Sequence, residues 1–455
     1  MSHSTLDALF HPKSIAVIGA SAKSGRIGRQ VVESLIKGGF RGEIYPINPK
    51  LKTLLGLQVF PSIEAVSKTV DCAIIVLKKD QVLNAIDRCG KSGVKSVIVM
   101  SSGFSELGDE STERELVRRV HEYDMRMLGP NCAGFALTHE RIYASFENRL
   151  LEGHMAFISQ SGAMCAVILG LARAVGLGLS IFISYGNAAD VGPEDILEYL
   201  HTHKPTQLIG GYIEGITQAR TFLQIAKKIV PHKPMIILKP GNTPDGVQAI
   251  HSHTGQLAGT KAVYAGAFRQ AGVLQVKTLD EFIDVCQVLS TQPLPQGNRV
   301  GIITNSGGPG VLAVDACARA GLATAPFPPS LVREFEAVLP PFCPMGNPVD
   351  LGPEGHPQTY QQVTELLLAE NSIDMGLVLC VPTVFSSIRA ISQSIAKAKQ
   401  NNPEKPLVTC WLAEDIVAEG LPVLRQAKIP NFPTPQRAAT ALAFLYRRAE
   451  WLRFH

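Results

Sequence analysis

One local pattern recurs three times and constrains the fold more than any other feature of the chain. A buried hydrophobic strand runs into a loop of small residues, and a helix follows; the openings lie near residues 14, 155 and 299 of a 455-residue chain. The spacing is about the size of one domain. The pattern predicts three α/β domains in series, each with a parallel sheet. The three loops are Gly19–Gly28, Ser159–Ala163 and Thr304–Gly310.

The first domain continues as a doubly wound sheet. Further hydrophobic runs at 43–50, 70–77 and 96–100 predict strands, separated by helices that include 81–89 and 112–123. Pro293–Gly297 is the clearest linker, whereas the end of the first domain is less sharply marked. We predict domains over residues 1–130, 150–292 and 297–455.

Composition excludes several classes of protein. Apolar residues make up 45% of the chain, and the net charge of +4 predicts no nucleic-acid-binding surface. The longest apolar runs are strand-sized, so we expect no membrane span. Nine cysteines are scattered singly without a CxxC pair, which disfavours a zinc site and suits reduced thiols. With no signal-peptide core near Met1, we expect a cytoplasmic protein without a bound metal.

The first glycine loop is a candidate phosphate site. A strand, a glycine loop and a helix place backbone amides at a helix N-terminus, which attracts phosphate. Donors and positive charge near it come from Ser21, Lys23 and Arg26, and at the end of the second strand from Asn48 and Lys50. A plain tight turn, with Lys50 as an ordinary surface lysine, is the alternative. No acidic residue ends the second strand to bind an NAD ribose, so a ligand with extra phosphate fits better.

The stretch Ile250–Gly259 surrounds His253 with small residues. The plain interpretation is a helix start capped by a serine or threonine. A neutral imidazole is also a competent nucleophile, and a histidine on such a loop could carry a group between two sites. Glu214, at the carboxyl end of an apolar strand, is placed to hold one imidazole nitrogen, although it could equally cap a helix. A phosphate seat is predicted at the second helix start, from Ser159, Ser161, Gly162 and Ala163.

Eight short motifs occur in order and carry a family resemblance. Together they resemble the α subunit of the NDP-forming acyl-CoA synthetases, the group of ADP-forming acetyl-CoA synthetase and relatives of succinyl-CoA synthetase. The match covers nearly the whole chain, and the set is specific although each motif alone is weak. The motifs are Gly19–Ser21, Asn48–Lys50, Gly103–Glu106, Gly129–Cys132, Ser159–Gly162, Tyr185–Asp190, Ser252–Gly255 and Thr304–Gly310.

The resemblance implies a role for each domain. The first would be a Rossmann-like CoA-binding domain, followed by two flavodoxin-like ligase domains, of which the first carries a phosphohistidine. It places the phosphorylated histidine at His253, its carboxylate partner at Glu214, and further CoA contacts at Gly103, Phe104 and Asn131. The implied reaction interconverts acyl-CoA, phosphate and ADP with a small carboxylic acid, CoA and ATP.

The chain also departs from the family pattern. Leu77–Lys79 lacks the usual proline, Thr434 precedes Pro435 in place of an acidic residue, and Gln256 follows the histidine motif. Because of these changes, the resemblance does not identify which acyl group the protein uses. No stretch fits an ATP-grasp nucleotide module or a Walker loop. The resemblance therefore implies a separate ATP-grasp β subunit, in a heterodimer or heterotetramer, that binds ADP or ATP with Mg²⁺.

Two alternatives belong to other classes. A CoA-binding regulatory or scaffold protein of the same fold would need no turnover, but the intact Ser252–Gly255 motif argues against it. An NAD(P)-dependent dehydrogenase is disfavoured by the stretched glycine loop and the missing ribose carboxylate.

Overall fold

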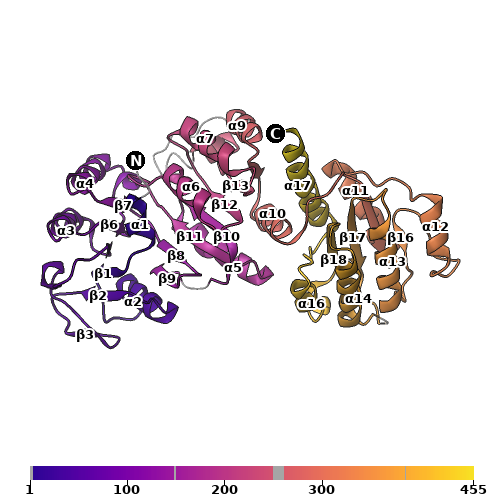
Figure 1. The fold of residues 1–455 in the computed structure, drawn as a ribbon, viewed down its shortest axis with the longest axis horizontal. Coiled ribbons are helices and arrows are strands. Elements are labelled where there is room, and N and C mark those ends of the chain that lie inside the picture. Colours follow the sequence, from indigo (N-terminus) through magenta and orange to yellow (C-terminus); the bar gives the residue numbers. More distant parts are fainter. Residues whose placement is uncertain (1–3, 148–149, 249–260, 385) are drawn as a thin grey trace. The chain divides into compact units, whose positions relative to one another are not determined.

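The computed structural model describes residues 4–147, 150–248, 261–384 and 386–455. By its internal contacts the chain divides into two units, Met1–Lys277 and Thr278–His455. Three main sheets are present in the described residues, two in the first unit and one in the second (Figure 1). The expected fold class, α/β with mostly parallel sheets, is confirmed.

The first sheet is parallel throughout, with strand order β2-β1-β5-β6-β7. Its order reverses at β1, and the carboxyl ends next to such a reversal form the crevice in which open α/β sheets bind ligands. Helices α3 and α4 share one hydrophobic core with its strands. The elements are α1 Ser4–Phe10, β1 Ser14–Ile18, α2 Ile27–Gly38, β2 Glu43–Ile47, β3 Thr53–Leu54, β4 Leu57–Gln58, β5 Cys72–Ile75, α3 Lys79–Lys91, β6 Ser96–Val99, α4 Glu110–Glu122 and β7 Arg126–Leu128.

The second sheet has the order β14-β13-β12-β10-β11-β8-β9. Its first five strands in that order are parallel, whereas β8 pairs antiparallel with both β11 and β9. The elements are β8 Gly134–Leu137, β9 Ile142–Ser145, β10 Glu152–Ser159, α5 Gly162–Val175, β11 Leu179–Ser184, α6 Pro193–Thr202, β12 Leu208–Tyr212, α7 Ala219–Ile229, β13 Met235–Leu238, α9 Lys261–Ala271 and β14 Leu274–Val276.

The third sheet, in the second unit, is parallel with the order β16-β15-β17-β18. Two hydrophobic core clusters fill its two faces. The elements are α10 Leu279–Thr291, β15 Val300–Thr304, α11 Gly307–Ala320, α12 Pro329–Glu336, β16 Val349–Asp350, α13 Pro357–Ala369, β17 Met375–Cys380, α14 Ile388–Asn401, β18 Leu407–Trp411, α15 Glu414–Val417, α16 Leu421–Gln426 and α17 Pro435–Phe454.

Four elements differ from the sequence prediction: three strands were not predicted, and one helix groups with a different unit. β7 adds a fifth strand to the first sheet, and β8 and β9 occupy the stretch left between the first two predicted domains. α10 falls within the predicted second domain, yet its contacts group it with the second unit, where Asp284 pairs with Arg437 of α17 at 2.7 Å. The predicted domain boundaries stay predictions.

The two sheets of the first unit are joined by a buried carboxylate. Asp190, which follows β11, accepts hydrogen bonds from the backbone N–H of Met127 at 2.7 Å and from the Arg126 guanidinium at 3.1 Å. The rings of Phe10 and Phe135 meet edge to face 5.3 Å apart. These contacts join the segment after β11 to β7, and α1 to β8. Among the described residues, no helix is both long and apolar enough to cross a bilayer.

Candidate active site

The glycine loop after β1 packs tightly and leaves a pocket beside it. A Cβ atom on Gly19, whose φ is +96°, would lie 2.1 Å from the Val76 carbonyl oxygen, and one on Gly28 would lie 2.2 Å from the Gly19 oxygen. Only glycine tolerates that approach. A pocket of about 380 Å³ opens here between the ends of β1, β2 and β5, with Gly19 and Asn48 in its lining. Asn48 ties the two loops together, because its Nδ2 donates to the Ala20 oxygen at 2.7 Å.

The pocket has apolar walls and few polar groups. Ile18, Ile63 and Leu77 line it, and Arg88 contributes the positive charge. Arg88 is already paired with Glu64 at 2.6 Å, and this hydrogen-bonded pair lowers the pKa of Glu64 to about 2. A pocket of this composition suits a nucleotide-like ligand, with apolar walls for a base and donors for phosphate.

The predicted basic residues of this site lie outside the pocket lining. Lys23, Arg26 and Lys50 are exposed, and the Ser21 hydroxyl accepts the Lys23 backbone N–H at 3.2 Å. None of these side chains lines the pocket beside Gly19. Their predicted contribution to phosphate binding therefore has to come from the rim of the site.

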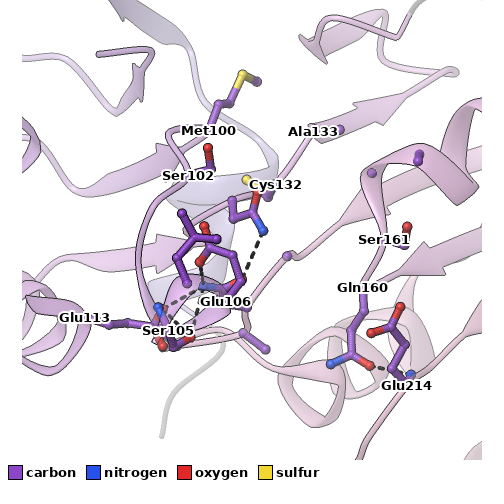
Figure 2. Close-up of a pocket in the computed structure, with 18 of the residues that line it drawn as sticks. Met100, Ser102, Ser105, Glu106, Glu113, Cys132, Ala133, Gln160, Ser161 and Glu214 are labelled. Atoms are coloured by element: carbon purple, nitrogen blue, oxygen red, sulfur yellow. Dashed lines mark hydrogen bonds between the residues drawn. The ribbon is translucent and has the colours of Figure 1, made fainter. Parts of the chain in front are cut away.

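A larger cavity, of about 950 Å³, lies where the carboxyl-end loops of the two sheets of the first unit meet (Figure 2). Asn131 and Cys132 line it from the end of β7, and Ser161, Gly162 and Ala163 from the start of α5. Glu214 lines it as well. The structure therefore brings the predicted phosphate seat and the predicted catalytic carboxylate to one cavity.

The helix start at α5 is shaped by two serines. The Ser161 hydroxyl accepts the Met164 N–H at 3.3 Å, so it caps α5. The Ser159 hydroxyl accepts the Ser161 N–H at 3.1 Å and donates to the Ser161 oxygen at 2.9 Å. Ser159 is fully buried and does not line the cavity. It therefore holds the loop, and Ser161, Gly162 and Ala163 are left to face a ligand.

Glu214 follows β12 and is held by two side chains that the sequence did not single out. Gln160 Oε1 accepts the N–H groups of Glu214 and Gly215, at 2.5 and 3.0 Å. Lys239 donates from Nζ to the main-chain carbonyl oxygen of Glu214 at 2.6 Å. Glu214 is 5% exposed. Burial, together with the charge of Glu214 and a side-chain hydrogen bond to it, raises the pKa of Tyr212. Both supporting residues come directly after a strand, β10 or β13, and that position was the one signal the sequence offered for them.

Asn187 joins the two halves of the cavity. Its Nδ2 donates to Glu106 Oε2 and to Glu113 Oε2, both at 2.7 Å, and to the Ser105 hydroxyl at 3.1 Å. Its Oδ1 accepts from Asn131 Nδ2 at 3.3 Å. Two of the quoted motifs contain Glu106 and Asn187, but the sequence assigned neither a role.

The contacts of Gly103 and Phe104 with CoA stay a prediction. The Phe104 ring is fully buried in the core of the first sheet. The amides of both residues donate to the Glu106 carboxylate. The N–H donors of this loop are therefore bonded to a carboxylate of the protein. Glu106, which accepts them, lines the cavity.

The charge of the larger cavity is mainly negative. Among the described residues that line it, carboxylates outnumber cations, and Arg114 is the one basic residue. The carboxylates are Glu106, Glu110, Glu113, Glu147 and Glu214. Cys132 also faces the cavity, but burial raises the pKa of its thiol to about 12, which keeps it protonated. His253 lies outside the described residues.

Three family models cover most of the chain. A CoA binding domain matches residues 13–138, a succinyl-CoA ligase-like flavodoxin domain matches 152–289, and a Ligase-CoA domain matches 300–454. They follow the order of the three predicted domains.

Relatives extend over the full length of the chain. It is 38% identical to the α subunit of acetate–CoA ligase [ADP-forming] II of Pyrococcus furiosus, over 98% of both chains. It is 36% identical to the acetate–CoA ligase [ADP-forming] of Methanocaldococcus jannaschii, over 97% of this chain but only 63% of that longer protein.

A solved structure is similar as well. The dinucleotide-forming acetyl-coenzyme A synthetase 1 of Ca. Korarchaeum cryptofilum, in complex with phosphate and ADP, matches with a TM-score of 0.93 and 37% identity. The match covers 99% of this chain and 98% of that one.

Proposed function

The chain belongs to the family of the α subunits of ADP-forming acetate–CoA ligases, and on that premise we propose that it catalyses the acid–thiol ligase reaction through a phosphohistidine at His253. The reaction interconverts acyl-CoA, phosphate and ADP with a carboxylic acid, CoA and ATP. The observation that carries the proposal is the cavity of about 950 Å³, where the α5 helix start and Glu214 face the end of the CoA-binding sheet.

The pocket beside Gly19 fits CoA. Glycines at 19 and 28 allow the close backbone approach, and the pocket joins apolar walls to the donors Asn48, Gln81 and Asn84. We assign the adenosine end of CoA to this loop, with Lys23 and Arg26 at its rim. The thioester end would reach the larger cavity, which borders the same sheet.

The chemistry proceeds in three displacements. An oxygen of inorganic phosphate attacks the thioester carbonyl, and the CoA thiolate leaves, giving an acyl phosphate. An imidazole nitrogen of His253 then attacks phosphorus, and the carboxylate leaves. ADP takes the phosphoryl group from the histidine to give ATP. Covalent relay through the histidine removes the need for ADP and thioester to meet.

The described residues supply the electrostatics of these steps. The amides at the start of α5, at the positive end of the helix dipole, would stabilise the charge that develops on the phosphoryl group. Glu214 would accept the other imidazole N–H, fixing the tautomer and balancing the imidazolium.

ADP and Mg²⁺ are assigned to a partner. The single-chain relative of Methanocaldococcus jannaschii extends well beyond the matched region, and the Pyrococcus furiosus relative is named as a subunit. We propose that an ATP-grasp β subunit binds the nucleotide, with Mg²⁺ neutralising its phosphates, in a cytoplasmic heterodimer or heterotetramer.

Reconstitution tests this function. The purified chain alone should form no ATP from acetyl-CoA, phosphate and ADP, and should do so once an ATP-grasp β subunit is added. A panel of carboxylic acids in the reverse direction then defines the acyl group. Robust ATP formation by the single chain would contradict the assignment of the nucleotide site to a partner.

A further inference from the structure

The turn that carries Glu214 is held by side chains rather than by neighbouring strands. It begins two residues after the end of β12. Gln160 Oε1 accepts hydrogen bonds from the main-chain N–H groups of Glu214 and Gly215, and Lys239 Nζ donates to the main-chain carbonyl oxygen of Glu214. The N–H of Ile216 donates to the Tyr264 hydroxyl at 3.3 Å. Side chains that follow β10 and β13 and one from α9 thus fix a single turn of main chain.

Lys239 is the unusual member of this group. It is 3% exposed, and its ammonium bonds to the carbonyl oxygens of Glu214 and Pro240, at 2.6 and 3.1 Å. It also lies 4.7 Å from the centroid of the Tyr264 ring. Burial lowers the pKa of Lys239, and the nearby charge of Glu214 acts in the opposite direction.

A buried ammonium is a costly way to satisfy a carbonyl group. A neutral donor would bond to the Glu214 oxygen without the desolvation cost of a charge. What the ammonium adds is a positive charge that interacts with the carboxylate of a cavity-lining residue, together with a fixed main chain for that residue. A carboxylate that must meet an imidazole needs its position set within about 0.5 Å.

We propose that Lys239 is a positioning residue for the phosphoryl-transfer chemistry, acting through Glu214. It anchors the main chain of Glu214 and supplies a positive charge that interacts with its carboxylate. This inference rests on the proposed function. It assigns Lys239 no contact with substrate.

The chain contains a matched control. Lys233 precedes β13 and likewise donates its Nζ to two carbonyl oxygens, those of Leu200 at 2.6 Å and His203 at 2.8 Å. Burial lowers its pKa as well. Lys233 does not line the cavity. Replacing either lysine by methionine keeps the length of the side chain and removes the charge and the donor.

The experiment compares Lys239→Met and Lys233→Met in the complex reconstituted with an ATP-grasp subunit. We expect kcat of Lys239→Met to fall by about 10- to 100-fold, the range that misplacement of a catalytic group produces. The KM for CoA should stay within about twofold, because the CoA loop belongs to another sheet. Lys239→Arg, which keeps the charge and donors, should recover part of the lost kcat. Lys233→Met should keep kcat within about twofold. It removes an equivalent pair of bonds to carbonyl oxygens, but at a lysine that does not line the cavity.

Unfolding measurements separate a positioning role from a structural one. Removing a buried charge relieves its desolvation, so we expect both methionine variants to fold, with similar unfolding midpoints. An unchanged kcat in Lys239→Met, or an equal loss in Lys233→Met, would overturn the inference while the proposed function stands. If the wild-type complex shows no turnover, the proposed function falls and this inference falls with it.

Discussion

The bridge made by Asn187 yields a prediction that can be worked out in detail. Its amide has two hydrogens, and the two shortest bonds go to carboxylates of Glu106 and Glu113, both at 2.7 Å. A hydrogen bond to a charged group contributes about 1.5–3 kcal/mol when it is buried, and less when water reaches it. Since all three side chains are partly buried, Asn187→Ala should destabilise the first unit by about 2–4 kcal/mol.

Asn187→Asp should cost more than Asn187→Ala, although aspartate has almost the shape of asparagine. It removes the donor and brings a third negative charge against two carboxylates. A like-charge pair 4 Å apart costs up to about 4 kcal/mol at an effective dielectric constant of 20. Below about pH 5 the introduced carboxyl group can be protonated and donate again, so the gap between the two variants should narrow as the pH falls.

The two tryptophans give this experiment an internal reference. Trp411 and Trp451 both lie in the second unit, so tryptophan fluorescence follows that unit alone, whereas circular dichroism follows both. In urea, Asn187→Asp should lower the dichroism midpoint and leave the fluorescence midpoint in place. As a control, Asn298→Asp removes an exposed bond to the Gly321 oxygen and should cost less than about 1 kcal/mol. An Asn187→Asp protein at least as stable as Asn187→Ala at pH 8 would refute the reasoning.

Three further predictions concern the active site, CoA binding and stability. Glu214→Gln should keep CoA affinity and lower kcat by about 100-fold or more, because the charge that balances the imidazolium is lost; unchanged turnover would argue against its role. Arg26→Ala should weaken CoA binding by roughly 1.5–3 kcal/mol in calorimetry if it makes a charge-assisted bond, and wild-type protein that binds NAD more tightly than CoA would contradict the assignment. Burial, aided by the charge of Lys233, lowers the pKa of His203 to about 4. The unfolded chain therefore takes up a proton near pH 6.5 that the folded chain resists, and stability should fall between about pH 6.5 and 4, by roughly 1–2 kcal/mol after allowance for solvent screening. His203→Gln should flatten that slope in urea titrations, and an unchanged slope would exclude His203 as its source.

The sequence predicted those parts of the fold that depend on local pattern. Buried parallel strands are runs of apolar residues, and the runs that form β1 and β6, near residue 14 and at 96–100, were identified for that reason. β7 was missed because it has three residues and begins with an arginine. β8 was missed because its pairing with β11, more than 40 residues away, leaves no trace in its own sequence.

The sequence predicted several residues of the site, but not the side chains that hold them in position. Glu214 and the α5 helix start do line one cavity. The family resemblance implied a CoA contact at Phe104, and nothing in the motif shows that its ring packs into the core. Gln160 and Lys239 act on a turn 25 to 55 residues away, and such long-range bonds cannot be derived from spacing.

The most direct test of the account is to locate the phosphoryl group. After incubation with ATP and the partner subunit, or with acetyl phosphate, the chain should carry an acid-labile, base-stable phosphate that maps to His253. The lability follows because a phosphoramidate loses its phosphate when its nitrogen is protonated. His253→Ala should lose both the label and turnover while CoA binding is kept, and His251→Ala should retain the label. Phosphate mapped to a serine or to His251, or full activity of His253→Ala, would contradict the account.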